Sequence, residues 1–269
     1  MLYVNFYTKI ISRYYKGRMY YVDLLADSGI NKIEKDLVLG SPIIASNFAY
    51  SPFDKLLLVE LDQKRAGALE LRLKRINMQS EIFVGNCNDK IDDLLEHLPF
   101  GSHYLAFIDC EGLEVKWETM EKLLNRPGDV IFTFQTQEIR RTWGNAMSKK
   151  SPMSKVASEK LLDFYGDDTW KTATSEKDLL EYYKKKISNV KILQTDASRT
   201  LIKDVNVESQ RGGFHYNLIF ATRETKTGSP WFESVVGSIK KRTEKNTGKF
   251  VKLALDILSG RSTNLEVFV

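Results

Sequence analysis

The stretch YYVDLLADSG at residues 20–29 decides the fold class, because a short apolar run ends there in a small, polar turn. Four further runs share this character: KLLLVELD (55–62), SEIFVGNC (80–87), HYLAFIDC (103–110) and DVIFTFQ (129–135). Runs of four to eight apolar residues, rich in β-branched and aromatic types, are typical of buried strands. The stretches between them, 40–50, 63–76, 88–98 and 114–124, repeat their apolar residues at helical spacing. Alternating strands and helices predict a parallel sheet covered by helices on both faces.

The first helix carries the clearest start signal. In GSPIIASNFAY (40–50), Ser41 has the character of an N-cap and Pro42 that of the first helical residue. The next helix, 63–76, places Ala66, Leu69, Leu73 and Ile76 on one apolar stripe. We therefore expect both helices to pack on the sheet through one face.

The second half of the chain is organised differently. RRTWGNAMSKKSPMSK (140–155) is polar and rich in Ser and Lys, so we expect a loop or a mobile cap there. The pattern then predicts helices at 158–166 and 175–187 and strands at 190–195 and 215–223. Beyond these come amphipathic helices PWFESVVGSIKKRTE (230–244) and KFVKLALDIL (249–258) and an edge strand NLEVFV (264–269). The expected domains are 1–225, with a loop and helical insertion at 144–187, and a basic helical extension at 226–269.

Composition excludes several classes of protein. The 269 residues contain two cysteines, Cys87 and Cys110, and three dispersed histidines, which argues against a disulfide framework and a metal site. No apolar run approaches the roughly 20 residues of a membrane span, and the first residues lack a signal-peptide pattern. We therefore expect a cytoplasmic protein without a membrane segment.

The net charge of +5 is concentrated near the end of the chain. Residues 223–261 contain nine Lys and Arg against four acids. A basic surface attracts phosphate backbones, whereas a solvated Lys-rich helix face is the alternative interpretation.

Polar or small residues follow each of the first four predicted strands. In an open parallel sheet, ligands bind outside the carboxyl ends of the strands, near the point where the strand order reverses. The residues at these ends are Asp23, Ala26, Asp27 and Gly29, then Glu60, then Asn86 and Cys87, then Asp109 and Glu111. Their recurrence predicts a nucleotide-like ligand.

Each of these positions suits one part of such a ligand. Gly29 lets the backbone approach closely, Glu60 can accept both ribose hydroxyls, and Asn86 can read an adenine edge. Asp109 would face the reacting group. The alternative for each is structural, because residues at strand ends often cap the next helix or anchor a loop.

The residues also resemble a known family. Eight segments appear in the order found in three-Cys-motif partner proteins: YVDLLADSG, GSPIIA, LVELDQKRAGAL, VGNCND, FIDCEGLEVKWETM, the arginine pair 140–141, FYGDDTW and HYNLIFATR. That family looks like class I S-adenosylmethionine-dependent methyltransferases and often accompanies a radical-SAM-like protein. The resemblance implies a Rossmann-like, doubly wound, mostly parallel seven-stranded sheet. It also implies S-adenosylmethionine as cofactor.

The resemblance assigns roles to individual positions. Asp23, Ala26 and Gly29 fall on the loop at the methionine end of the cofactor. Glu60 falls on the ribose acid, Asn86 on the adenine side and Asp109 on the catalytic motif.

The chain also departs from the family pattern. Asp27 and Ser28 stand where a second glycine and a proline are usual, and Cys110 and Glu111 replace Pro-Phe. A carboxylate at Asp27 would lie near the charged groups of a methionine moiety, where it can repel the carboxylate or attract the ammonium.

Two functions therefore stand side by side. The first is a methyltransferase in which Asp109 accepts a hydrogen bond from the nucleophile and Glu111 acts as base, with nucleic acid as a candidate acceptor. The second is a catalytically inactive, methyltransferase-like partner or scaffold.

Two basic groups are candidates for nucleic-acid contacts. Arg140 and Arg141 come after the fifth strand, close to Trp143, and Lys240, Lys241 and Arg242 lie in the tail. The alternative for the first group is an ordinary surface turn. For the tail, a helix–turn–helix reader is a third and weaker hypothesis.

Overall fold

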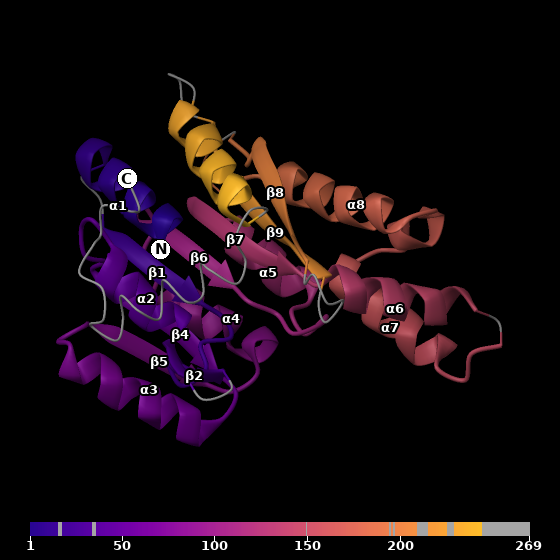
Figure 1. Cartoon of the computed structure of the whole chain (residues 1–269), viewed down its shortest axis with the longest axis horizontal. Helices are drawn as coiled ribbons and strands as arrows, with labels where there is room; N and C mark the ends of the chain where they lie inside the picture. Colours follow the sequence, from indigo (N-terminus) through magenta and orange to yellow (C-terminus); the bar gives the residue numbers. More distant parts are fainter. Residues whose placement is uncertain are drawn as a thin grey trace.

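A twisted seven-stranded sheet forms the centre of the molecule (Figure 1). The computed structural model describes residues 1–15, 18–33, 36–148, 150–193, 195, 197–208, 215–224 and 229–243. The strands of this sheet are β1 (Met19–Asp23), β4 (Lys55–Glu60), β5 (Ser80–Val84), β6 (His103–Ile108), β7 (Gly128–Phe134), β8 (Leu201–Glu208) and β9 (His215–Thr222).

The strand order is β5-β4-β1-β6-β7-β9-β8. The first five strands of this order run parallel to one another, and β9 is antiparallel to both β7 and β8. After β5 the chain returns to the opposite side of β1 to form β6, so the strand order reverses between β1 and β6. This arrangement confirms the predicted Rossmann-like, doubly wound, mostly parallel sheet.

Helices cover both faces of the sheet. One face packs against α1 (Leu2–Tyr14), α2 (Ser41–Phe48) and α3 (Gln63–Arg75), and the other against α4 (Cys87–Glu96), α5 (Trp117–Leu124), α7 (Ser154–Tyr165) and α8 (Glu176–Asn189). Alternation along the strands explains the two cores, because Tyr21 of β1 faces the first group while Tyr20 and Val22 face the second.

The prediction of a loop at 140–155 is wrong for most of these residues. Helix α6 (Thr136–Met147) covers its first half, and α7 begins at Ser154, so these two helices form a hairpin that projects from the body (Figure 1). Ile139 and Thr142 are buried on α6. The apolar stripe of α6 begins before residue 140, so the polar composition of 140–155 conceals it.

The predicted strand at 190–195 is also wrong. Lys191 makes only an isolated bridge to Ser198, and the strand beside β9 is β8, at Leu201–Glu208. Val205 and Val207 of β8 are buried while Asn206 between them is exposed, as suits an edge strand with one covered face.

Further elements complete the description. A hairpin of β2 (Ile30–Ile33) and β3 (Asp36–Leu39), which the sequence did not suggest, joins β1 to α2, and a 3-10 helix spans Thr169–Thr172. A capping box of Ser175 and Asp178 starts α8.

The described part of the C-terminal extension is one helix. Residues 230–243 are helical, and Phe232, Val235 and Val236 pack into the core that contains Tyr3 of α1. The predicted helix at 249–258 and the predicted strand at 264–269 lie outside the described residues. Within the described ranges, no helix has the length and apolarity to cross a bilayer.

Candidate functional site

Four residues predicted to bind a ligand lie in a row along one rim of the sheet. Asn86, Gly29 and Asp109 follow the strands β5, β1 and β6, and Glu60 is the last residue of β4. These strands are neighbours in the order β5-β4-β1-β6. Because these strands are parallel, all four residues lie at the carboxyl ends. The row spans the reversal of strand order between β1 and β6, where open α/β sheets bind their ligands.

The turn after β1 depends on close backbone contact at Gly29. Its φ of +78° lies in the left-handed region, and a Cβ atom there would come within 2.7 Å of Leu69 Cδ1. Gly40 donates its N–H to the Gly29 carbonyl at 2.8 Å, and a Cβ on Gly40 would lie 2.9 Å from Gly29 Cα. The two glycines therefore fix the start of α2 against the loop.

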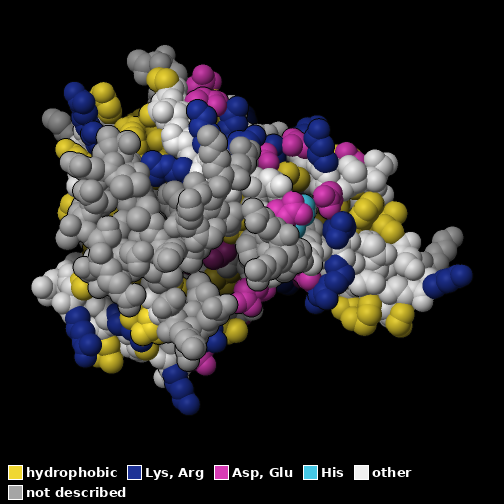
Figure 2. Space-filling model, viewed as in Figure 1, with side chains coloured by type: hydrophobic (Ala, Val, Ile, Leu, Met, Phe, Trp, Pro, Cys, Tyr) yellow, Lys and Arg dark blue, Asp and Glu magenta, His cyan; other side chains and the backbone are white. Residues whose placement is uncertain are grey.

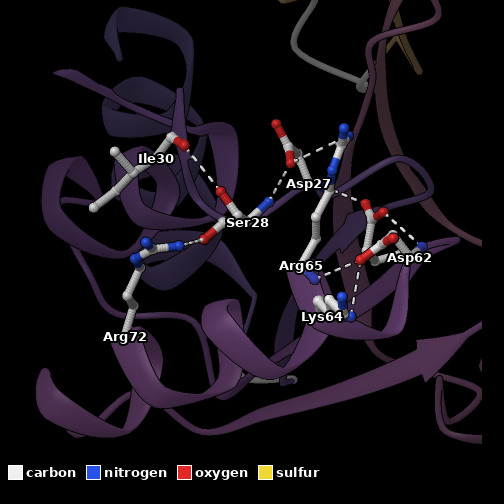
Figure 3. Close-up of polar contacts among 8 residues, drawn as sticks. Asp27, Ser28, Ile30, Asp62, Lys64, Arg65 and Arg72 are labelled. Atoms are coloured by element: carbon white, nitrogen blue, oxygen red, sulfur yellow. Dashed lines mark hydrogen bonds and ion pairs between the residues drawn. The ribbon is translucent and has the colours of Figure 1, made fainter. Parts of the chain in front are cut away.

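Asp27 and Glu60 join this loop to the end of β4. The backbone N–H of Asp27 donates to Glu60 Oε2 at 2.7 Å, and that of Asp62 donates to Glu60 Oε1 at 2.9 Å. Asp27 has a φ of +50°, uncommon for a residue other than glycine. The Asp27 carboxylate accepts the Ser28 N–H at 2.6 Å and lies 3.5 Å from Arg65 Nη1 (Figure 3).

Glu60 keeps the capacity to accept further hydrogen bonds. Its side chain is almost entirely buried, and each carboxylate oxygen accepts only one of the two N–H groups described above. A carboxylate offers about four lone-pair sites, so both oxygens can still accept a hydroxyl. The loop opposite Glu60 is braced from α3, where Arg72 donates to the Ser28 carbonyl (Figure 3).

Asp23 lies beneath the loop rather than on its surface. Its side chain is fully buried and accepts hydrogen bonds from Ser41 Oγ at 2.6 Å, Tyr21 Oη at 3.2 Å and the Leu25 N–H at 3.1 Å. Burial raises the pKa of Asp23 to about 7, against the opposing effect of these hydrogen bonds. In this position Asp23 anchors the loop from below.

Ser41 differs from its predicted role. Gly40 occupies the N-cap position of α2, and Ser41 is the first helical residue. Its hydroxyl donates to Asp23 instead of accepting from the helix backbone. The motif GSPIIA thus ties α2 to β1 through a side-chain contact that spacing alone does not reveal.

Asp109 is the carboxylate on the other side of the switch point. Part of its side chain is open to solvent, while protein atoms enclose the rest. Thr133 of β7 donates to its Oδ1 at 2.8 Å. The surrounding protein and, to a lesser degree, the charge of Glu111 raise the pKa of Asp109, while the Thr133 hydrogen bond lowers it. Glu111 itself is exposed two residues further on.

Asp109 also acts on neighbouring groups. Its charge adds to the effect of burial in raising the pKa values of Asp23 and of Tyr216 on β9. These three side chains therefore share one electrostatic environment at the junction of β1, β6 and β9.

Asn86 and the two cysteines have structural contacts. Asn86 is the N-cap of α4, and its Oδ1 accepts from the backbone N–H and the side-chain Nδ2 of Asn88. Cys87 and Cys110 are both buried, and burial raises the pKa of Cys87 to about 11 and that of Cys110 as well. Buried thiols with raised pKa values are poor nucleophiles at neutral pH.

Ala26 supports the loop through its backbone. It is buried, and its N–H donates to the Val59 carbonyl at 2.9 Å, which ties the end of β1 to β4. A small side chain suits this covered position.

The predicted basic residues lie on two different helices. Arg140 and Arg141 are on α6, where Arg140 Nη1 lies 3.7 Å from Glu176 Oε2 and Arg141 pairs with Glu138 at 2.7 Å. Trp143 is half-buried and packs against the core, so its ring is not a free stacking platform. Lys240, Lys241 and Arg242 lie near the end of the described part, 230–243, of the C-terminal helix.

Sequence reasoning missed several residues that hold the site. Thr133 is a polar residue inside an apolar strand, which is a usable signal, and Gln135 donates to the Cys110 carbonyl just beyond that strand. Asn88 ties α4 to the segment after β6, because its Oδ1 accepts from the Lys116 N–H and Thr119 Oγ1 and its Nδ2 donates to the Glu114 carbonyl. No local pattern in the sequence predicts these long-range contacts.

Within the part of the chain that the structure describes, no group of three or more His, Cys, Asp or Glu side chains could hold a metal ion.

Comparison with known proteins yields a likeness in fold. No family model and no curated protein matches the chain. Among solved structures, protein LPL1258 of Legionella pneumophila, of the DUF519 family, is similar with a TM-score of 0.50 at 13% identity, over 90% of each chain.

Two methyltransferase structures are less similar. An rRNA methylase from Streptococcus thermophilus gives a TM-score of 0.42 at 11% identity, over 81% of this chain and 94% of the other. An O-methyltransferase from Bacillus cereus in complex with SAH gives 0.42 at 12%, over 81% and 80%. At these identities the comparison with LPL1258 concerns the fold alone.

Proposed function

We propose that the protein is an S-adenosylmethionine-dependent methyltransferase. The observation that carries the proposal is the row of Asn86, Glu60, Gly29 and Asp109 at the carboxyl rim, across the reversal of strand order. One of the solved methyltransferases named above was crystallised in complex with SAH.

The residues present suit this cofactor. Glu60 has acceptor sites left for ribose hydroxyls, and the close packing of Gly29 against Leu69 and Gly40 holds the loop after β1 beside it. Asn86 offers a side-chain amide next to Glu60, although its oxygen already caps α4. The negative charge of Asp27, partly balanced by Arg65, selects the ammonium rather than the carboxylate of a methionine moiety.

The chemistry asks little of the protein beyond positioning. The cofactor supplies an activated methyl group when bound. Asp109 accepts a hydrogen bond from the acceptor and orients it, and Thr133 holds the Asp109 carboxylate in place. Glu111, exposed beside it, is the candidate base that removes a proton.

Calorimetric titration with S-adenosylmethionine and S-adenosylhomocysteine tests the proposal. We expect both to bind, and Glu60→Gln to weaken them at least tenfold, because one carboxylate oxygen becomes a donor. Glu118→Gln, at an exposed position on α5, is the matched control. Thermal melts must show that Glu60→Gln remains folded, because Glu60 also holds two backbone N–H groups.

The outcomes separate the two functions. If neither S-adenosylmethionine nor S-adenosylhomocysteine gives heat of binding, the proposed cofactor site is refuted. Binding without methyl transfer to RNA, DNA or protein would favour the inactive scaffold, consistent with Cys110 and Glu111 standing where the family has Pro-Phe. An accessory role beside a radical-SAM-like protein, suggested by the motif resemblance, stays a prediction for co-purification to test.

We propose nucleic acid as the class of acceptor, because a group of basic residues lies on helix α6, which begins just after β7 at this rim. Arg140 and Arg141 belong to that group. Lys240, Lys241 and Arg242 are a second proposed contact with nucleic acid, which measurements of oligonucleotide binding can test.

A further inference from the structure

A cavity of about 630 Å³ lies on the same rim as Asp109 but beyond it, toward the far edge of the sheet. Thr136, just after β7, lines it together with Asn206 near the end of β8 and His215 at the start of β9. Since β9 is antiparallel, its start lies at the carboxyl rim of β7. A volume of this size is within the range of pockets that bind small ligands.

The segment after β7 links this cavity to the proposed active site. Thr133 donates to Asp109, and Gln135 donates to the Cys110 carbonyl. The next residue, Thr136, lines the cavity and donates to Asn217 Oδ1 at 2.7 Å. Four consecutive residues, 133–136, therefore connect the two places.

Several polar side chains lining the cavity have unused hydrogen-bonding capacity. Among the described residues, the side chains of Gln137, Lys177, Asn206 and His215 have no hydrogen-bond partner. Glu176 Oε2 is buried and accepts no hydrogen bond, with Arg140 Nη1 at 3.7 Å. These groups can therefore form new hydrogen bonds to a polar ligand.

The lining of the cavity combines two cations, two acids and several neutral polar side chains. Arg140 and Lys177 are the cations of its wall, and Glu176 and Glu208 are the acids. Gln137 and Asn206 are amides that can both donate and accept. Arg and Lys bind phosphate, and side-chain amides form paired hydrogen bonds with base edges. A nucleotide combines both kinds of group.

The hairpin of α6 and α7, here named the arm, extends this basic character away from the body. Its residues, 136–165, contain six Lys and Arg against the three acids Glu138, Glu159 and Asp163. Figure 2 shows basic side chains where the arm leaves the body and again at its far end. Arg140 belongs both to the arm and to the cavity wall, so the two surfaces are continuous.

We propose that the cavity receives one extruded nucleotide of a nucleic-acid chain whose phosphate backbone lies along the α6–α7 arm. This inference rests on the proposed function, because the nucleotide would be the methyl acceptor. Enzymes that modify a base take it out of the stack into a pocket, and backbone contacts hold the strand in register. Arg140 and Lys177 bind the flanking phosphates, and Gln137 and Asn206 contact the base edge.

The first test is salt-dependent binding of fluorescein-labelled single-stranded RNA and DNA 15-mers, measured by anisotropy with SAH present. For a single strand, each phosphate contact contributes about −0.7 to the slope of log K against log salt. We expect Arg140→Gln and Lys177→Gln each to reduce the slope by about this amount, and Lys155→Gln and Lys160→Gln on the arm to act likewise. Lys74→Gln, on α3, is the matched control and should leave the slope unchanged.

The second test reports on the cavity itself. A 15-mer containing 2-aminopurine should gain fluorescence on binding, since an extruded base is unstacked. Asn206→Phe, which fills the cavity from an exposed edge position, should abolish the gain and leave the salt slope unaltered.

The results distinguish failure of this inference from failure of the proposed function. If SAH binds in calorimetry but no oligonucleotide binds at 50 mM salt, the nucleic-acid site is refuted and the cofactor proposal stands. If oligonucleotides bind with the expected slopes and fluorescence while SAH does not, the binding site stands and the methyltransferase proposal falls. Equal slopes for the arm variants and the wild type, or preferential binding to anionic vesicles, would overturn the inference.

Discussion

Thr133 and Asp109 connect the ends of two neighbouring strands through one hydrogen bond of 2.8 Å. Thr133 lies on β7 and Asp109 directly follows β6, so the contact fixes the carboxylate at the switch point. Asp109 is exposed yet surrounded by protein, which raises its pKa, and the Thr133 hydroxyl opposes that effect. The balance of these two effects sets the pH at which the carboxylate can accept a hydrogen bond.

Replacement of Thr133 by Val should raise the pKa of Asp109 further, because the ionised form loses a donor. The acceptor form of Asp109 is lost as the pH falls through this raised pKa, so the acidic limb of any methyl-transfer profile should move to higher pH. Carboxyl-carbon NMR titration measures the shift without reference to activity. Thr133→Ser retains a hydroxyl and should titrate like the wild type; equal titration of the Val and Ser variants would contradict the assigned role.

Asp23→Asn should alter how stability depends on pH. The folded-state pKa of about 7 lies above the ordinary 3.8, so the folded protein binds this proton more tightly than the unfolded chain. The stabilisation that the protonated Asp23 gives to the folded protein is complete below about pH 4 and is lost as the pH rises toward 7. At about 1.4 kcal/mol per pKa unit, we expect a difference on the order of 2–4 kcal/mol between variant and wild type to develop over this range.

Urea unfolding at pH 4.5, 6.0 and 7.5 measures that difference. Asn can still accept the Leu25 N–H through its Oδ1, and the Ser41 hydroxyl can turn to accept from its Nδ2, so the variant should fold. Asp168→Asn, at an exposed position, should follow the wild type at each pH. Parallel curves for Asp23→Asn and the wild type would show that Asp23 does not titrate in this window.

Gly29→Ala should destabilise the protein by about 2 kcal/mol. An added Cβ would overlap Leu69 Cδ1 at 2.7 Å, and the φ of +78° is unfavourable for alanine. Gly67→Ala is the matched control, because Gly67 lies within α3 with no atom within 4 Å of its added Cβ. There the helix propensity of alanine should stabilise by about 0.5–1 kcal/mol. Thermal unfolding of both variants tests these opposite signs.

Arg199→Lys should cost about 3 kcal/mol. The fully buried guanidinium donates to the carbonyls of Gly128, Leu124 and Arg126 and to Tyr104 Oη, at 2.6–2.9 Å. A lysine ammonium cannot reproduce this planar set, so buried acceptors would be left unpaired. Chemical denaturation gives the free energy of unfolding; Arg75→Lys, exposed at the end of α3, should change it by less than about 0.5 kcal/mol.

The first half of the fold was predictable because its signals are local. The five apolar runs from 20 to 135 became β1, β4, β5, β6 and β7, and the amphipathic stretches between them became helices. The alignment of Gly29, Glu60, Asn86 and Asp109 followed from parallel pairing alone, which brings carboxyl ends together on one rim.

The second half was less predictable because tertiary contacts decide it. The run at 190–195 contains apolar residues because Val190 and Ile192 are buried in the core. These residues nevertheless do not form a strand of the sheet. Strand β8 is polar on one face, so its sequence has no continuous apolar run that would predict a strand. It forms by pairing with β9, which is a separate segment of the chain.

The sequence by itself determined the sheet class and the rim on which the candidate residues lie, because hydrophobic period and strand direction are local or pairwise properties. Only the tertiary structure decided that Asp23 is a buried anchor, that Thr133 supports Asp109 and that a polar cavity lies between α6, α8 and β9. These features arise where segments more than a dozen residues apart in the chain come into contact, and no spacing along the sequence encodes which side chains meet there.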